Sequence, residues 1–151
     1  MAFLFLTIVV ARGLTAGTIL GLGMMIPMKA KVGTRAQANY LSQMYRGVGP
    51  RIYGAANVSM TSALGILSLW TLAARGADAF SSLLLASLGL TGLGLLGTFF
   101  SLRAMRGLWS AVDKDDSSRS PFVDRFARWH IYGAVCHTAA FIILSLAAPF
   151  L

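Results

Sequence analysis

Four long apolar stretches fill most of this chain and constrain its fold more than any other feature. They cover Ala2–Pro27, Ile52–Ala74, Ala79–Leu102 and Trp129–Leu151 of the 151 residues. A helix of about 20 apolar residues, rising about 1.5 Å per residue, crosses a hydrocarbon core roughly 30 Å thick. The sequence therefore predicts an integral membrane protein with four transmembrane helices.

The links between these stretches are too short to fold alone, so we expect one domain covering residues 1–151. Short links favour antiparallel neighbours, and the predicted fold is an all-α four-helix bundle in up-down topology. A further helix is expected between the first two spans, beginning near Thr34 and ending near Gly47. Its apolar residues recur at helical spacing, which suits a short helix in the membrane interface. A loop that covers the end of the bundle is the alternative. The residues with this spacing are Tyr40, Leu41, Met44, Tyr45 and Val48.

The third helix is predicted to continue beyond the membrane, because an apolar stripe runs on from Leu102 to Val112. A polar turn follows at Asp113. We expect the fourth helix to begin early, with Ser120 as its N-cap and Pro121 at its first position. The two extensions would form a helical hairpin that projects from the membrane and offers a docking surface.

Charge predicts the orientation of the helices. The formal charge is +8, and eleven Lys and Arg residues lie in the loops that join spans one to two and three to four. The turn between spans two and three carries only Arg75, beside Asp78. The positive-inside rule places the two basic loops on the cytoplasmic or matrix side of a bacterial or mitochondrial inner membrane. Contact with anionic lipids explains this excess charge better than nucleic-acid binding.

Small residues are predicted to hold the helices together. Gly13, Gly17 and Gly21 form a GxxxGxxxG ridge on the first span, a glycine zipper that lets a neighbouring helix of this or another chain approach closely. Polar stripes on spans two and three should face inward, whereas Leu84 is expected to face lipid. The stripes comprise Asn57, Thr61, Gly65 and Ser68 on span two, and Ser87, Thr91, Gly94 and Thr98 on span three.

Arg12 is the residue that most suggests a site, because a guanidinium deep in a span is costly. Its side chain either points into the bundle or snorkels to the headgroups. The histidines of span four lie seven residues apart, too far along a helix to be the two axial ligands of one haem, and they either bind neighbouring polar groups or help to line a site. We expect no metal and no cofactor, since the single cysteine, Cys136, excludes metal-finger motifs. The predicted cavity residues are Arg12, Asn57, Thr61, His130 and His137.

Several short motifs are shared with a known family. They are Gly13–Gly17 with Met25–Pro27, Tyr40–Met44, Arg128–Trp129 and His137–Thr138. With these motifs the chain resembles the small four-span anthrone-oxygenase-like membrane family, which is largely of unknown function. The resemblance implies a cofactor-independent oxygenase acting on a polycyclic phenol, with His137 as candidate base and Arg12 stabilising a phenolate. Residues 101–106 lack the Asn-x-Pro-x-Asn element that is typical of the family.

The sequence favours a non-catalytic accessory subunit that packs among lipids and other subunits of a larger membrane complex, such as an energy-converting one. The alternative is the oxygenase. The hypothesis of a transporter has less support, because the spans lack a pair of helices broken by glycine or proline.

Overall fold

The protein is all-helical in the parts that its structure, a computed structural model, describes. These are residues 1–24, 29–47, 49–111, 113 and 115–151, and they contain helices and turns but no strand. The prediction of an all-α fold is confirmed. The elements are α1 (Ala2–Met24), α2 (Lys29–Arg46), α3 (Gly49–Arg75), α4 (Ala79–Ala111), α5 (Asp116–Leu146) and a 3-10 turn, η2 (Ala148–Phe150).

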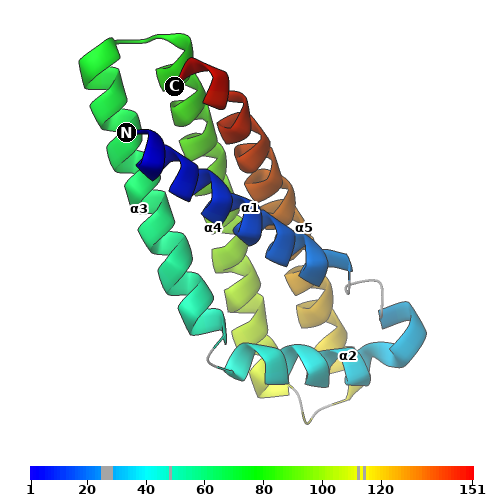
Figure 1. Cartoon of the computed structure of the whole chain (residues 1–151). Coiled ribbons are helices and arrows are strands. Elements are labelled where there is room, and N and C mark those ends of the chain that lie inside the picture. Colours follow the sequence, from blue (N-terminus) through cyan, green and yellow to red (C-terminus); the bar gives the residue numbers. More distant parts are fainter. Residues whose placement is uncertain (25–28, 48, 112, 114) are drawn as a thin grey trace.

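The four long helices form a bundle in which α3, α4 and α5 run along the long axis (Figure 1). Helix α1 crosses the others obliquely and packs against α3 and α5, while α4 and α5 share the most extensive contact. Both termini lie at the end that holds the turn from α3 to α4, and α2 crosses the opposite end (Figure 1). We call these the terminal end and the α2 end.

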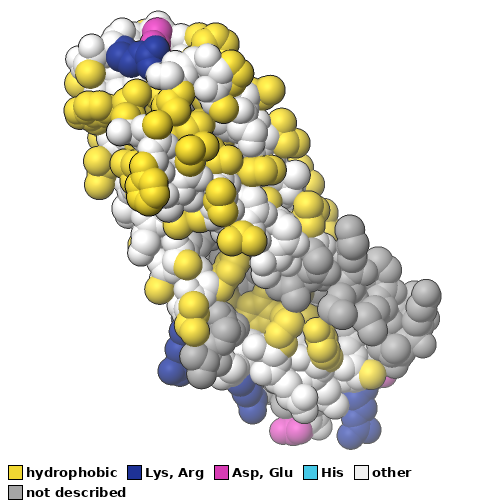
Figure 2. All heavy atoms as spheres, in the orientation of Figure 1, with side chains coloured by type: hydrophobic (Ala, Val, Ile, Leu, Met, Phe, Trp, Pro, Cys, Tyr) yellow, Lys and Arg dark blue, Asp and Glu magenta, His cyan; other side chains and the backbone are white. Residues whose placement is uncertain are grey.

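The four long helices define a multi-pass membrane protein. Their candidate spans are Ala2–Leu20, Arg51–Arg75, Ala79–Ala111 and Asp116–Phe150, each long and apolar enough to cross a bilayer. Large apolar side chains point outward, including Phe3 at 84% exposed and Leu14 at 69%. On the face drawn in Figure 2, charged side chains gather at the two ends and hydrophobic ones lie between them. Such a surface suits lipid rather than water.

The hairpin of α4 and α5 confirms one prediction and corrects another. Helix α4 continues to Ala111, as expected. Helix α5 begins at Asp116 rather than near Ser120, because Asp115 is the N-cap and its carboxylate accepts from the backbone N–H of Ser118 at 3.1 Å. Pro121 therefore lies inside the helix.

The last candidate span reaches Phe150, close to the predicted Leu151. Within it the regular α-helix α5 stops at Leu146, and η2 follows. Pro149 has no N–H to continue the α-helical hydrogen bonds. The predicted end of the first span, Pro27, lies outside the described residues.

The segment between α1 and α3 is a helix, not a loop. Gly33 has a φ of 84° and interrupts α2, so the regular part begins at Thr34 and ends at Arg46, close to the predicted limits. Val48 lies outside the described residues. Ala38 and Leu41 of α2 pack against the hairpin, whereas Tyr40 is 45% exposed. The hairpin residues in this cluster are Ala104, Met105, Leu108, Val123 and Phe126.

All four long helices contribute to an apolar core at the terminal end. Leu84 is fully buried there, so the prediction that it faces lipid is wrong. Leucine is stable both in lipid and in a protein core, so the face of α4 on which Leu84 lies determines its environment. The core comprises Phe5, Ile8, Leu64, Leu67, Phe80, Leu84, Leu144 and Ala147.

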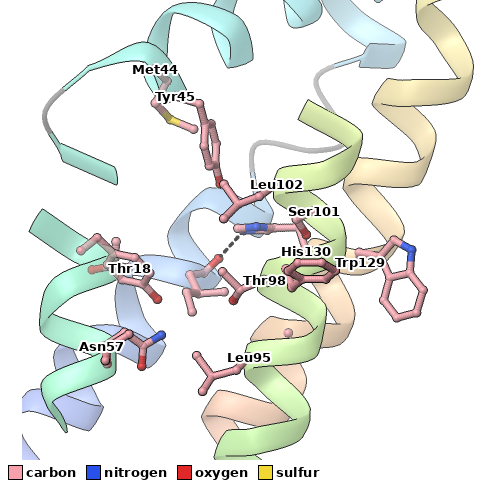
Figure 3. A pocket seen from close by; sticks show the side chains of 16 residues that line it. Thr18, Met44, Tyr45, Asn57, Leu95, Thr98, Ser101, Leu102, Trp129 and His130 are labelled. Atoms are coloured by element: carbon pink, nitrogen blue, oxygen red, sulfur yellow. Dashed lines mark hydrogen bonds between the residues drawn. The ribbon is translucent and has the colours of Figure 1, made fainter. Parts of the chain in front are cut away.

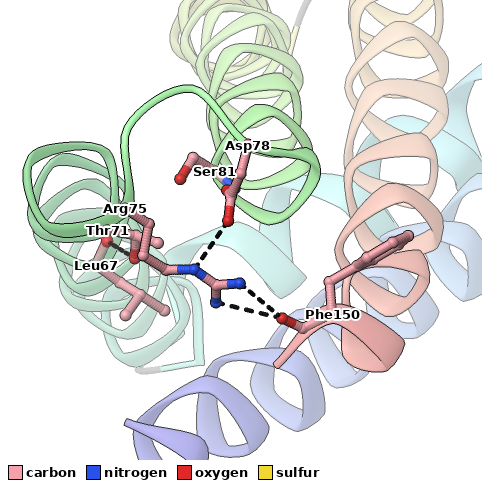
Figure 4. A network of polar contacts seen from close by, with 6 residues as sticks. All are labelled: Leu67, Thr71, Arg75, Asp78, Ser81 and Phe150. Atoms are coloured by element: carbon pink, nitrogen blue, oxygen red, sulfur yellow. Dashed lines mark hydrogen bonds and ion pairs between the residues drawn. The ribbon is translucent and has the colours of Figure 1, made fainter.

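A polar clamp closes the terminal end (Figure 4). The Arg75 guanidinium pairs with Asp78 at 2.8 Å and donates to the carbonyl oxygen of Phe150 at 3.2 and 3.3 Å. The Asp78 carboxylate also accepts from the backbone N–H of Ser81, and that bond, followed by Arg75, holds the pKa of Asp78 below its ordinary value. The clamp joins α3, α4 and the C-terminal turn.

Candidate functional site

A cavity of about 510 Å³ lies at the α2 end of the bundle (Figure 3). Every helix contributes to its wall, and most of the wall is apolar or aromatic. A volume between about 300 and 1,000 Å³ is usual for sites that bind small organic molecules. The lining residues are Thr18, Ile19, Met44, Tyr45, Tyr53, Gly54, Asn57, Val58, Leu95, Thr98, Phe99, Ser101, Leu102, Trp129, His130 and Gly133.

Arg12 points into the bundle and is only 1% exposed, so the snorkelling alternative is excluded. Its Nη1 donates to Oδ1 of Asn57 at 2.9 Å, and its Nη2 donates to the hydroxyl of Thr61 at 2.7 Å. The Thr61 hydroxyl in turn donates to the carbonyl oxygen of Asn57 at 2.7 Å. Because Asn57 and Thr61 stand one turn apart on α3, both face the same guanidinium. Arg12 thus joins α1 to α3 directly behind the cavity wall.

His130 lines the cavity and links α5 to α1. Its Nε2 lies 3.1 Å from the carbonyl oxygen of Ile19. A carbonyl oxygen only accepts, so Nε2 carries the proton of this hydrogen bond. The ring also stacks on Phe126, with 5.3 Å between centroids, and Phe126 meets the ring of Tyr45 edge-on at 5.4 Å. These contacts connect the cavity wall to α2.

Tyr45 brings a phenol from α2 to the cavity, and its hydroxyl points inward (Figure 3). Burial raises the pKa of Tyr45 to about 12. The hydroxyl therefore keeps its proton at neutral pH and remains available as a hydrogen-bond donor.

His137 does not line the cavity. It is 1% exposed, and neither ring nitrogen has a hydrogen-bond partner among the described residues. The ring lies against Gly94 of α4, where an added Cβ would stand 2.8 Å from Nε2. His137 remains within electrostatic reach of Arg12. It therefore occupies a space in the α4–α5 contact that only glycine leaves open.

The five predicted cavity residues thus separate into three groups. Asn57 and His130 line the cavity, and Arg12 and Thr61 lie behind its wall through their bonds to Asn57. His137 lies apart, between α4 and α5. The geometry gives no route from a molecule in the cavity to His137 as a base, so its catalytic role stays a prediction.

The glycines of the predicted ridge have different surroundings. Gly13 contacts Phe141 of α5, where an added Cβ would lie 3.0 Å from the ring. Gly17 is exposed, and among the described residues no atom of another helix lies within 4 Å of an added Cβ. The surroundings of Gly21 are outside the described part. Gly17 is therefore free to contact a lipid or a second protein.

A close backbone contact between α4 and α5 was not predicted. An added Cβ on Gly97 of α4 would stand 2.8 Å from both Cα and N of Gly133 on α5. The sequence signal was present, because Gly94 and Gly97 lie one turn apart and Gly133 sits inside the last span. The aromatic cavity residues were also missed, since Tyr53, Phe99 and Trp129 look in sequence like lipid-facing or interfacial side chains.

Fold and site together define a helical, multi-pass membrane protein with a mainly apolar cavity inside its bundle. No protein-family model matches the chain, and no curated protein or solved structure matches it. The resemblance to the anthrone-oxygenase-like family therefore stays a prediction, and the function is argued from the site.

Proposed function

We propose that this protein binds a small apolar molecule, bearing at least one hydrogen-bonding group, within its membrane-embedded bundle. The observation that carries the proposal is the cavity of about 510 Å³ with apolar and aromatic walls and a few polar groups. Sites for small organic ligands have this composition, in which apolar walls provide affinity and a few polar groups fix orientation.

The proposed placement in the membrane follows the charges and the helix order. The helices alternate in direction, the α2 end faces the cytoplasm or matrix of an inner membrane, and α2 lies in the interface. This orientation is supported by the basic residues of α2 and the hairpin, among them Arg35, Arg46, Arg103 and Arg125. A ligand would then enter from the lipid or from the basic side.

The test is to fill the cavity. Leu95 points into it (Figure 3), whereas the neighbouring Leu96 is 51% exposed. Binding of an apolar fluorescent naphthalene to the purified protein in mild detergent should saturate. Leu95→Trp should abolish that binding, and the matched control Leu96→Trp should preserve it. Binding that does not saturate, or that both variants retain, would contradict the proposal.

A second candidate is the accessory subunit of a larger membrane complex, favoured by the exposed and uncovered Gly17. Glycine on an exposed face of a transmembrane helix suits close approach of another helix. Extraction in mild detergent should then yield a particle far above 16.1 kDa. Gly17→Leu should release the chain from that particle without unfolding it. An unchanged particle in the variant would exclude Gly17 as the contact.

The oxygenase alternative has less support. It requires a polycyclic phenol in the cavity, which the volume allows, but Arg12 and His137 do not line that cavity. The test is oxygen uptake by the purified protein in the presence of such a phenol. Uptake that is lost in His137→Leu would support the oxygenase.

A further inference from the structure

The bond from Arg12 determines which atom of Asn57 is free. A guanidinium only donates hydrogen bonds, so the Asn57 atom 2.9 Å from its Nη1 must be the carbonyl oxygen Oδ1. The amide nitrogen Nδ2 is then the other end of the side chain, and it points into the cavity (Figure 3). The N–H groups of the Asn57 amide can therefore donate hydrogen bonds to a ligand in the cavity.

Tyrosine hydroxyls add further donors. Tyr53 lies one turn before Asn57 on α3, and its buried hydroxyl has no hydrogen-bond partner in the described part of the chain. The Tyr45 hydroxyl points into the same space.

The other polar side chains of the wall already use their protons. The hydroxyls of Thr18, Thr98 and Ser101 donate to carbonyl oxygens of their own helices. His130 donates to Ile19. The Trp129 indole is turned away from the other wall side chains (Figure 3). Among the described wall residues, the donors left for a ligand are thus the Asn57 amide and the two phenols.

Arg12 adds a positive charge that forms no ion pair with a carboxylate of the described residues. Its hydrogen-bond acceptors, Asn57 and Thr61, are neutral, and its Nε has no partner among the described residues. All five acidic residues are aspartates at position 78, in the turn at the terminal end, or at positions 113–124 in the hairpin. A charge buried in a membrane protein is normally paired, so a counter-charge is missing here.

We propose that the cavity ligand places an acceptor oxygen on the Asn57 amide and is bound preferentially as an anion, such as a carboxylate or a phenolate. Arg12 is the positioning residue. It fixes the orientation of the amide and stabilises the negative charge from behind the wall. This inference rests on the proposed function, since it specifies the chemistry of a ligand in the same cavity.

Three naphthalenes of similar size test it in the full-length protein in a non-ionic detergent at pH 7. They are 2-naphthoate, which is ionised at this pH, its neutral amide 2-naphthamide, and 2-isopropylnaphthalene, which has no oxygen. The naphthoate should bind about tenfold more tightly than the amide, because a hydrogen bond to a charged group is the stronger one. The amide should bind more tightly than the hydrocarbon.

Variants show whether the preference for an anion comes from the cavity or from the basic surface of the protein. Asn57→Leu should remove the preference for oxygen, and Arg12→Leu should lower the ratio of naphthoate to naphthamide affinity toward one. Arg12→Lys should restore part of that ratio. Arg35→Gln, at the exposed basic end and away from the cavity wall, is the control that should leave the ratio unchanged.

The outcomes distinguish this inference from the proposed function. Equal affinity of the wild-type protein for the three compounds would overturn the inference and leave the proposed function in place. A ratio that falls in Arg35→Gln but not in Arg12→Leu or Asn57→Leu would overturn it as well, by assigning the preference to the surface. Failure of all three to bind saturably would contradict both.

Discussion

The terminal end of the bundle is filled with side chains, whereas a partly open cavity lies at the α2 end. Eight buried apolar residues from four helices meet at the terminal end. At the α2 end, Gly97 and Gly133 draw α4 and α5 together, and Gly54 and Gly133 face the cavity without a side chain. Gly133 takes part in both features, because it lies in the close contact between α4 and α5 and also lines the cavity.

The largest expected effect distinguishes the two ends directly. Leu84→Ala leaves a void in a filled core and should lower the free energy of unfolding by about 2–5 kcal/mol. Leu95→Ala only enlarges an existing cavity and should cost clearly less. Unfolding in mixed detergent, followed by circular dichroism, gives both values, with Leu96→Ala as the lipid-facing control. Equal losses at Leu84 and Leu95 would remove the distinction between the ends.

Next in size is the polar link behind the cavity. Asn57→Leu removes an acceptor from a buried guanidinium and should lower the free energy of unfolding by about 1.5–3 kcal/mol. The double variant Arg12→Leu/Asn57→Leu should recover part of this loss, because no unpaired charge remains. Thr18→Val, whose hydroxyl bonds only its own helix, is the control. Additive losses in the double variant would mean that the two side chains do not interact.

The close contact between α4 and α5 should tolerate no added atom. Gly97→Ala forces a methyl group against the backbone of Gly133 and should destabilise the protein by about 1–3 kcal/mol. Gly92→Ala, on the same helix with open space around it, should be neutral or slightly stabilising. Similar melting temperatures for the two variants would show that the helices are farther apart than described.

The smallest effect concerns the tip of the hairpin formed by α4 and α5. Hydrogen bonds from Ser118 and Ser117 lower the pKa of Asp115 to about 2, from the ordinary 3.8. A lowered pKa means that Asp115 contributes its full stability above about pH 4 and loses it as the pH falls toward 2. Asp115→Asn should flatten this part of the pH profile of the melting temperature, whereas Asp113→Asn should not. Identical profiles for wild type and Asp115→Asn would exclude the cap as the cause.

The helices could be predicted from sequence because hydropathy over 20 residues is a strong signal. The start of α5 could not, since Ser120 and Asp115 both satisfy the preference for an N-cap. What decides is tertiary packing, because α4 continues alongside and buries Arg119 and Val123. The core position of Leu84 could not be predicted either, because leucine occurs both in protein cores and on surfaces that face lipid.

The candidate site was predictable only in part. Arg12 was singled out by its cost in the membrane, and Asn57 and Thr61 by their shared face, and the structure joins these three. His137 was assigned to the cavity by depth alone, but depth does not say toward which neighbour a side chain turns. The cavity is lined in part by small residues, among them Gly54 and Gly133. The sequence does not show whether the space beside a small residue is filled by a neighbouring side chain or left open.

The length of the α4–α5 hairpin has a practical consequence for imaging so small a protein. Helix α4 has 33 residues and therefore extends about 50 Å, some 20 Å more than the hydrocarbon core. Helices α4 and α5 are paired, and the chain passes from one to the other between Ala111 and Asp115. A rigid soluble domain inserted there would be continuous with both helices. It would give a particle of 16.1 kDa the added mass and asymmetry that electron microscopy needs to align it.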